Sequence, residues 1–357
     1  MSMRVQAFEI IRTWLFYSVV QSELLFGRVP WRTALISGWG LSEQGKKLSK
    51  RDLDKSTGPD GYNRYVPDDV MGKYGADAVR LWATKGRIGT DLRYNEKDIR
   101  TGRKFAVKLW NVGRFLSMNL GDLDVLSPAM PPGERDIVDR WVLSHLADTV
   151  AEATAVFGAH DYMQAHQAAS RMFWSVYCDR YLEMIKDRLA GSTVRDSTDL
   201  EYPDRDSAGR DRAGRDSARW TLWESFRVVL GLFAPFALFV TERMYQQFYR
   251  THEGTVSLHL TRWPEPDERW RGDRSAVAAV DQLTVILDAT RALRSGQRLG
   301  NSARLSRLTV QAHNAQARSL LDQIAEPLRV AARADTLVRG PAEHPSGVDG
   351  ITVGIAV

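Results

Sequence analysis

The chain has 357 residues, 43% of them hydrophobic, and at about 150 residues per domain this length predicts two to three domains. Its ordinary content of 27 glycines and 13 prolines excludes a fibrous repeat and wholesale disorder. One cysteine, Cys178, excludes an intrachain disulfide and favours a reducing compartment, so we expect a soluble, cytoplasmic protein. The longest apolar run, 228–240, is too short to span a bilayer, so we expect no membrane partner.

The net charge of +5 is unevenly distributed. Residues 1–120 carry a net charge of +9, whereas the remaining residues sum to −4. A basic first third favours a polyanionic partner, although an ordinary solvated surface explains the charge equally well.

The first third reads as part of an α/β layer followed by a long helix. We expect a helix over 7–20, a buried strand over 34–36 and a long exposed loop over 42–68. The helical period returns at 95–120, with an apolar stripe formed by Phe105, Leu109, Val112 and Leu116. The opposite side of that helix carries five cations: Arg100, Arg103, Lys104, Lys108 and Arg114. Their pattern alone favours a solvated face over a nucleic-acid contact.

The rest of the chain reads as an all-α bundle and then a small α+β module. Helices are expected over 134–157, 161–189 and 220–249, with core packing by the aromatic residues Phe173, Trp174, Tyr177 and Tyr181. The Arg/Asp-rich tract 205–219 is interpreted as a mobile insertion, and 253–266 as extended. The module is expected to contain helices 275–294 and 315–332 and strands 305–312 and 351–357. The fold class is therefore mainly α with a partial Rossmann-type segment.

The sharpest local signal is the loop GKKLSK at 45–50. Lys47 and Lys50 stand three residues apart on a loop that follows the predicted strand. Ammonium groups in this arrangement suit a polyphosphate whose charge grows as a bond breaks. Lysine-rich surface loops are common, so the spacing alone leaves both interpretations open.

Ordered motifs over residues 4–300 place this loop in context. They include QAFEIIRTWLFY (6–17), PWRTALISGW (30–39), PDDVMGKYGADAVRLWA (67–83), GRKFAVKLWNVGRF (102–115) and YCDRYLEMIKDRL (177–189). With the loop, these motifs resemble valine-type class I aminoacyl-tRNA synthetases. The resemblance implies a catalytic-domain portion with a K-M-S-K-S-like loop over 1–94, an anticodon-binding bundle over 95–270 and the small module over 271–357.

The resemblance also implies roles for individual residues. Lys50 would bind the ATP phosphates and stabilise the departing pyrophosphate, with Lys47 assisting. Ser49, Gly38 and Trp39 would border the ATP site, with a structural role as the alternative for Trp39. The cationic face of 95–120 would contact tRNA phosphates. ATP with Mg²⁺ and a valine-type tRNA are the implied partners. No protein-bound metal is expected, because His160, His166, His259, His313 and His344 lack ligand spacing.

Two departures from the family pattern leave three hypotheses open. Arg51 replaces the final serine of the loop motif, and no histidine precedes His145, although class I enzymes need a His-x-Gly-His element upstream of the loop. His252 begins a superficially similar stretch, which we interpret as a helix terminus. The chain is then a synthetase part completed by a separately encoded N-terminal half, a non-catalytic tRNA-binding paralogue, or a truncated product.

Overall fold

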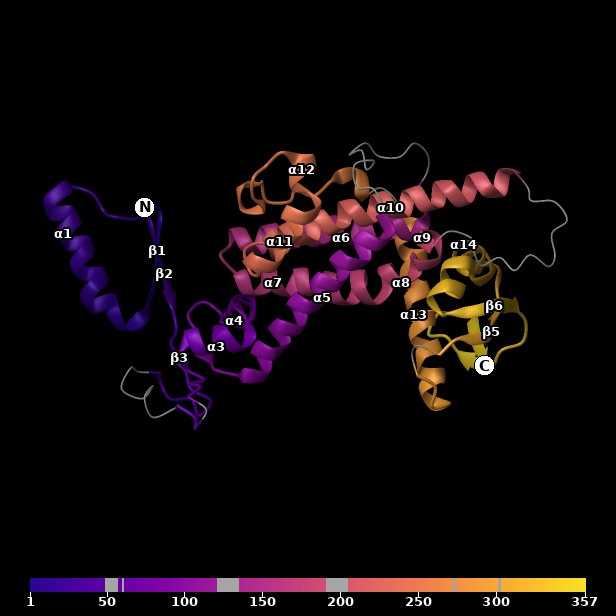
Figure 1. Cartoon of the computed structure of the whole chain (residues 1–357), viewed down its shortest axis with the longest axis horizontal. Coiled ribbons are helices and arrows are strands. Elements are labelled where there is room, and N and C mark those ends of the chain that lie inside the picture. The colour runs from indigo at the N-terminus through magenta and orange to yellow at the C-terminus, as the bar shows by residue number, and fades with distance from the viewer. Residues whose placement is uncertain (49–56, 60, 121–134, 191–204, 272–273, 301–302) are drawn as a thin grey trace. The chain divides into compact units, whose positions relative to one another are not determined.

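A computed structural model describes residues 1–48, 57–59, 61–120, 135–190, 205–271, 274–300 and 303–357, with 205–211 as backbone only (Figure 1). By packing, the chain divides into two compact units that interleave in sequence. The first comprises Met1–Gly113, Glu152–Ala168 and Leu230–Arg262, and the second Arg114–Ala151, Ala169–Val229 and Trp263–Val357.

The first unit begins with two parallel strands joined by a helical crossover. Strand β1 (Met3–Ala7) pairs with β2 (Thr33–Ser37), in a register that matches Met3 with Thr33. Between them the chain forms a 3₁₀ turn (Phe8–Ile10), a π-helical turn (Ile11–Leu15) and helix α1 (Phe16–Phe26). The predicted strand 34–36 is confirmed, but its predicted burial is wrong, because Ala34 is exposed and Leu35 and Ile36 are only half-buried. The predicted helix 7–20 is wrong at its start, because residue 7 closes a strand that only pairing with β2 reveals.

A small aromatic core follows in the same unit. Strand β3 (Gly40–Leu41) pairs in parallel with β4 (Leu92–Arg93), and helices α3 (Pro67–Tyr74) and α4 (Ala76–Ala83) lie between them in sequence. Pro67 occupies the first turn of α3, where its missing N–H needs no partner. The loop predicted over 42–68 therefore ends two residues early. The core residues are Val70, Tyr74, Ala78, Tyr94 and Ile99.

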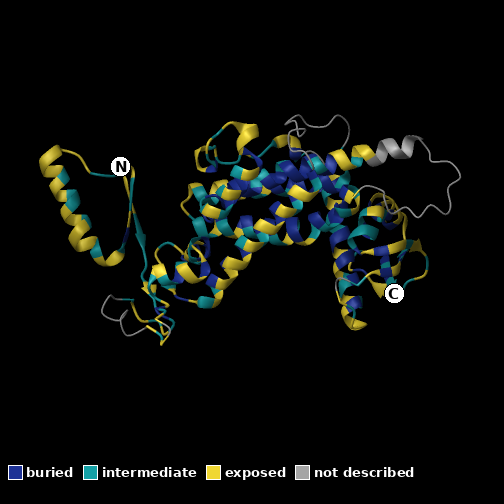
Figure 2. Cartoon of the chain, viewed as in Figure 1, coloured by how far each residue is buried: buried dark blue, intermediate teal, exposed yellow. Residues whose placement is uncertain are grey.

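Long helices form the middle of the chain. They are α5 (Glu96–Leu120), α6 (Ile137–Gly158), α7 (Tyr162–Arg171), a π-helical stretch (Met172–Tyr181), α8 (Leu182–Met184), α9 (Lys186–Ala190), α10 (Arg205–Phe233), α11 (Leu238–Phe248) and α12 (Arg250–Glu253). The predicted packing role of Phe173, Tyr177 and Tyr181 is confirmed, since all three are fully buried, as the dark blue interior in Figure 2 illustrates. Gly254, with φ +68°, ends α12, which confirms the predicted helix terminus.

Three expectations in this region are wrong. The tract 205–219 is the start of α10 rather than an insertion, because Ala218 is buried and the Ser217 hydroxyl donates to buried Asp139 (2.6 Å). The predicted helix 220–249 breaks at 234–237, where Pro235 cannot continue the hydrogen-bond ladder. Residues 258–260 form a 3₁₀ turn instead of extended chain, capped by the Ser257 side chain.

The C-terminal module, in the second unit, has a four-stranded sheet and two long helices. The elements are α13 (Arg274–Gly296), β5 (Leu305–Ala312), α14 (Ala315–Ala331), β6 (Ala334–Arg339), β7 (His344–Pro345) and β8 (Ile351–Ala356), preceded by a 3₁₀ turn, Glu268–Trp270. The strand order is β6-β5-β8-β7, with β5 parallel to β6 and antiparallel to β8. The predicted helices and strands are confirmed, while β6 and β7 were not predicted. Within the described residues, none of the helices is long and apolar enough to cross a membrane.

Candidate nucleotide site and basic helix face

The predicted phosphate loop folds back as a hairpin at its described end. Gly45 adopts φ +80° at the turn, and its N–H donates to the Ser42 carbonyl (2.9 Å). The Leu48 N–H then donates to the Gly40 carbonyl (3.1 Å), which brings Lys47 opposite Leu41. Ser49 and Lys50, the other loop residues predicted to bind ATP, lie outside the described residues.

Lys47 meets two groups at the carboxyl ends of β1 and β2. Its ammonium forms an ion pair with Glu9 and lies 4.6 Å from the centroid of the Trp39 ring. Phe8 packs on the same indole, with ring centroids 4.6 Å apart. Both partners of the ion pair remain partly exposed, at 43% and 39% of their side-chain area. The structure thus brings together Lys47 and Trp39 of the predicted set, and adds Phe8 and Glu9.

Sequence reasoning missed Glu9 because residues 7–20 read as one helix. A sequence signal was available: in parallel α/β layers, ligand-binding groups gather beyond the carboxyl ends of strands. Had the strand over residues 3–7 been recognised, Phe8 and Glu9 would have been candidates on that ground.

Gly38 places Trp39 through a close backbone approach. A Cβ at position 38 would lie 2.2 Å from the Thr90 carbonyl oxygen, so only glycine fits there. The next N–H, of Trp39, donates to the Asp91 carboxylate (2.7 Å). Of the predicted ATP-site residues, Gly38 therefore has a demonstrable structural reason to be glycine.

Glu43, in the same hairpin, contacts two residues that lie further along the chain. The Glu43 N–H donates to the Tyr65 hydroxyl (3.3 Å), and the Glu43 carboxylate pairs with Arg64 (3.2 Å). The charge of Glu43 raises the pKa of Arg64. Tyr65 in turn packs edge-to-face on buried Tyr94, with centroids 5.2 Å apart. The aromatic core therefore holds the base of the loop.

Chemically, this cluster offers a cation, a carboxylate and an aromatic face. An ammonium can bind a phosphate oxygen, a carboxylate can accept from a hydroxyl, and an indole can cover an apolar ring. The Lys47–Glu9 pair must open or turn for Lys47 to reach a phosphate. Among the described residues, no group of three or more His, Cys, Asp and Glu could hold a metal ion.

The amphipathic character predicted for α5 is confirmed. Phe105, Leu109, Val112 and Leu116 are buried, while the five predicted cations lie on the other side, four of them exposed and Lys108 half-buried.

Two of these cations already have partners within the described part of the chain. Arg100 pairs with Glu96 (3.1 Å), and Arg103 donates to the Lys73 carbonyl (3.3 Å). A hydrogen bond from Tyr74, and then the Arg100 and Lys73 charges, lower the pKa of Glu96 although burial opposes this. Lys104, Lys108 and Arg114 form no ion pair with a described residue. Exposed Val107 and Trp110 on the same side were not predicted as part of a site.

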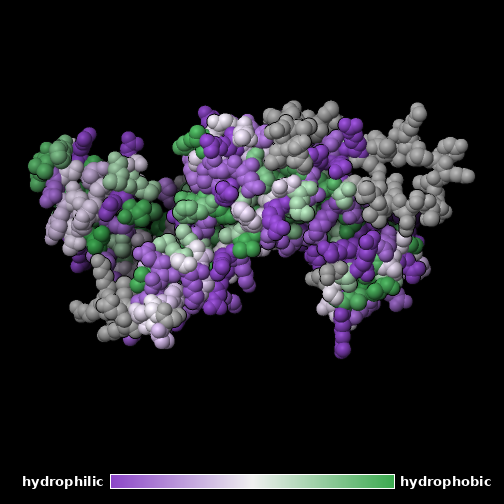
Figure 3. Space-filling model, viewed as in Figure 1, coloured by the Kyte–Doolittle hydropathy of each residue, from purple (hydrophilic) through white to green (hydrophobic). Residues whose placement is uncertain are grey.

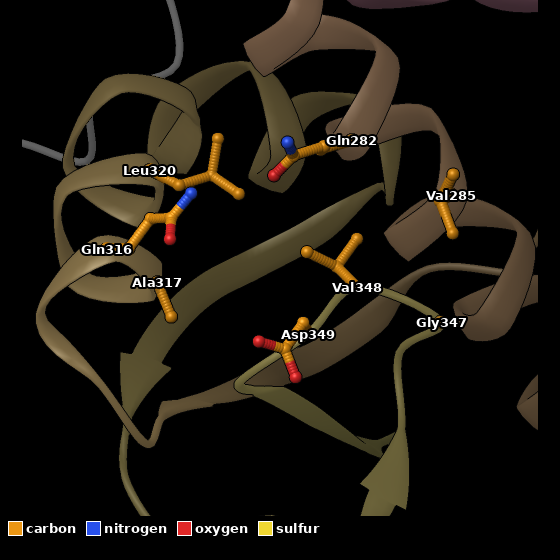
Figure 4. A pocket seen from close by; sticks show the side chains of 8 residues that line it. All are labelled: Gln282, Val285, Gln316, Ala317, Leu320, Gly347, Val348 and Asp349. Carbon is orange, nitrogen blue, oxygen red and sulfur yellow. The ribbon is translucent and has the colours of Figure 1, made fainter.

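A shallow cavity in the C-terminal module lies apart from all predicted site residues in sequence. Its volume is about 290 Å³, and α13, α14 and the loop before β8 line it (Figure 4). The polar side chains at its wall are Gln282, Gln316 and Asp349.

Comparison with known proteins agrees with the fold. Residues 1–95 match the model for class I tRNA synthetases (I, L, M and V), and residues 139–310 match the anticodon-binding domain of tRNA ligase. A solved structure, the ternary complex of Agrobacterium radiobacter K84 agnB2 LeuRS-tRNA-LeuAMS, superposes with a TM-score of 0.52 at 17% identity, over 76% of this chain and 29% of that one. At this identity the superposition establishes the fold alone.

The curated relatives narrow the comparison to one kind of tRNA ligase. The valine–tRNA ligase of Thermobifida fusca is 36% identical over 95% of this chain and 34% of its own length. That of Salinispora arenicola is 38% identical over 75% of this chain and 27% of its own length. The chain thus spans between about a quarter and a third of the length of these relatives. Its residues 1–95 are similar to class I tRNA synthetases, and the curated relatives that the chain matches over most of its length are valine–tRNA ligases.

Proposed function

We propose that this chain is the tRNA-binding part of a cytoplasmic valine-type synthetase and also supplies its ATP-phosphate loop. The observation that carries the proposal is the exposed cationic side of α5, in a chain that matches an anticodon-binding domain. Lys104, Lys108 and Arg114 are available for phosphate oxygens, and Trp110 offers a surface on which an unpaired base can stack. We retain the division at 1–94, 95–270 and 271–357 as part of this proposal.

Binding of a valine tRNA transcript to the purified chain tests the RNA role. Because phosphate contacts release counterions, each lost contact lowers the slope of log affinity against log salt by about one. We expect Lys104→Gln with Lys108→Gln to weaken binding and reduce that slope by about two.

The matched control removes two other exposed cations, Arg212 and Arg215, on α10. The double variant Arg212→Gln with Arg215→Gln should bind as the unchanged chain does. Equal loss in both double variants, or no tRNA binding at low salt, contradicts the proposal.

In valine adenylation, Lys50 would hold the ATP phosphates and stabilise pyrophosphate as it leaves, and Lys47 would assist after parting from Glu9. Mg²⁺ would enter with ATP. Residues 1–144 contain no histidine, so adenylation would also need the His-x-Gly-His element from a part of the synthetase that the 357 residues do not contain.

Valine-dependent ATP–pyrophosphate exchange tests this second role. We expect no exchange from the chain alone. Exchange should appear when the missing part of the Thermobifida fusca relative is added, and should be lost in Lys50→Ala. Exchange by the chain alone would contradict the requirement for a second half.

The second candidate is a non-catalytic tRNA-binding paralogue. The absent histidine element and Arg51 favour it. It predicts tRNA binding that depends on α5, with no exchange under any complementation.

A further inference from the structure

Two adjacent lysines in the hairpin after β3 have different surroundings. Lys46 is exposed, and its side chain forms no ion pair or hydrogen bond with a described residue. Lys47 is exposed too, but its ammonium forms an ion pair with Glu9 and lies 4.6 Å from the centroid of the Trp39 ring. Neighbouring side chains in extended backbone point to opposite sides, which explains why only one of the two lysines meets these groups.

The partners of Lys47 are held in place independently of it. Glu9 lies in the 3₁₀ turn Phe8–Ile10, directly after β1, and the pairing of β1 with β2 fixes where that turn begins. Trp39 follows β2, and its N–H donates to the Asp91 carboxylate (2.7 Å). In Figure 3, hydrophilic (purple) and hydrophobic (green) residues are intermixed over β1, β2 and β3 at the left. Because carboxylate and indole are already positioned, the ion pair costs less side-chain entropy than one between two mobile groups.

The backbone around Lys47 is fixed as well. The Lys46 N–H donates to the Ser42 hydroxyl (3.2 Å), and the Lys46 carbonyl accepts from the Ser42 N–H (2.7 Å). On the other side of Lys47, the Leu48 N–H donates to the Gly40 carbonyl (3.1 Å). Hydrogen bonds therefore close the hairpin on both sides of Lys47, and the backbone itself directs its side chain toward Glu9.

A phosphate group would compete with the Glu9 carboxylate for the Lys47 ammonium. Both are oxygen anions that accept hydrogen bonds from the same three N–H donors. The carboxylate also repels an incoming polyphosphate, since both anions approach the same ammonium. The two side chains of the pair are partly exposed, so water and salt weaken it, and an anion of higher charge can displace the carboxylate.

We propose that Glu9 is an internal competitor for Lys47, which it holds back from phosphate until a polyphosphate displaces it. The ligand class is a nucleoside or inorganic polyphosphate. This inference rests on the proposed function, in which Lys47 assists in holding the ATP phosphates. It adds a residue whose effect is to lower the affinity of the loop for phosphate.

Binding of inorganic tripolyphosphate to the full 357-residue chain tests the proposal. Titration calorimetry at low salt compares the unchanged chain with Glu9→Gln, which keeps the shape of the side chain and removes its charge. We expect Glu9→Gln to bind about three- to tenfold more tightly. The gain should shrink at high salt, because salt screens an exposed ion pair.

A double-mutant cycle assigns the gain to Lys47. Lys47→Gln should weaken tripolyphosphate binding, and adding Glu9→Gln to it should recover little of the affinity. The matched control is Glu43→Gln, since this carboxylate of the same hairpin pairs with Arg64 instead (3.2 Å). An equal gain in Glu43→Gln, or a full gain from Glu9→Gln in the absence of Lys47, would reveal a general charge effect and overturn the proposal.

Carbodiimide cross-linking measures the ion pair directly. The reagent joins a carboxylate to an amine that it touches, and peptide mass spectrometry shows which lysine is linked to Glu9. We expect the link to form with Lys47 and not with Lys46, and tripolyphosphate should reduce its yield. Linkage to both lysines alike, or a yield that tripolyphosphate does not change, contradicts competition for Lys47.

Failure of this inference is distinguishable from failure of the proposed function. Equal tripolyphosphate affinity of the unchanged chain and Glu9→Gln refutes the competition and leaves Lys47 its phosphate role. Absence of binding in both chains refutes the phosphate role and the competition together. Binding by Glu9→Gln alone supports the competition in its strongest form. Loss of tRNA binding refutes the RNA role and does not bear on Glu9.

Discussion

Two segments of this chain share one local topology and differ in what surrounds them. Both β1–α1–β2 and β5–α14–β6 are parallel strand–helix–strand units. Helix α14 buries Ala317, Leu320, Leu321, Ile324 and Leu328, whereas α1 buries no residue. In the C-terminal unit, α13 and the antiparallel strand β8 complete the layer. The local sequence pattern is therefore enough to form a strand–helix–strand unit. Burial of its helix requires further elements that pack against it, such as α13 and β8 in the C-terminal module.

The largest expected contrast is between matched leucines. Leu308→Ala, at a fully buried position of β5, should cost about 2–5 kcal/mol because it leaves a cavity. Leu24→Ala on α1 should change stability by no more than about 0.5 kcal/mol. Peptide-resolved hydrogen exchange in urea measures both. Equal costs would mean that α1 is packed in solution, which contradicts the comparison.

Gly38→Ala tests the close backbone contact between the end of β2 and residue 90, within the first unit. The added Cβ meets the Thr90 backbone, which cannot rotate away, so we expect a loss of about 1–3 kcal/mol. Hydrogen exchange at 89–94 should accelerate, while the C-terminal module should not respond. Gly40→Ala, whose nearest neighbour would be 3.8 Å away, is the control.

The start of α14 offers a smaller effect. The Asn314 side chain accepts from the Ala317 N–H (2.7 Å) as a helix cap, whereas α1 has no side-chain cap. Asn314→Ala should destabilise the module by about 1 kcal/mol. Ser319→Ala, an exposed change on the same helix, should have no measurable effect in urea unfolding. If the two substitutions cost the same, the cap contributes nothing.

The smallest effect concerns pH. Glu183 on α8 forms an ion pair with Arg333, which lies next to β6 (3.1 Å). Burial raises the pKa of Glu183, but the charges and hydrogen bonds of Lys186 and Arg333 together lower it by more, so the net shift of the pKa is downward. A lowered carboxyl pKa contributes stability above the unfolded value near 4.5, and this is lost as pH falls through the folded value.

For a half-exposed pair the contribution should stay below about 1 kcal/mol. Unfolding the module in urea at pH 7 and at pH 4 measures it. The decrease in the free energy of unfolding from pH 7 to pH 4 should be smaller in Glu183→Gln. The segment β1–α1–β2 should show none of this pH dependence. An unchanged loss in Glu183→Gln would assign the acid sensitivity to another group.

The sequence by itself determined the amphipathic helices, the strands 305–312 and 351–357 with the helix between them, and the family resemblance. These depend on short-range periodicity and on ordered motifs that need no partner to be recognised, as the buried stripe of α5 illustrates. The pairing of Lys47 with Glu9 and the true start of α10 depended on contacts between distant residues.

Only the tertiary structure decided those features. It also decided that residues 3–7 and 334–339 are strands, because each is recognised only by its pairing with the neighbouring strand. The same reason explains Gly38, whose need for glycine comes from a backbone 52 positions away in sequence. Apolar residues 16–26 predict a helix wherever they occur, but whether that helix is buried depends on what packs against it, and in this chain nothing among the described residues buries it.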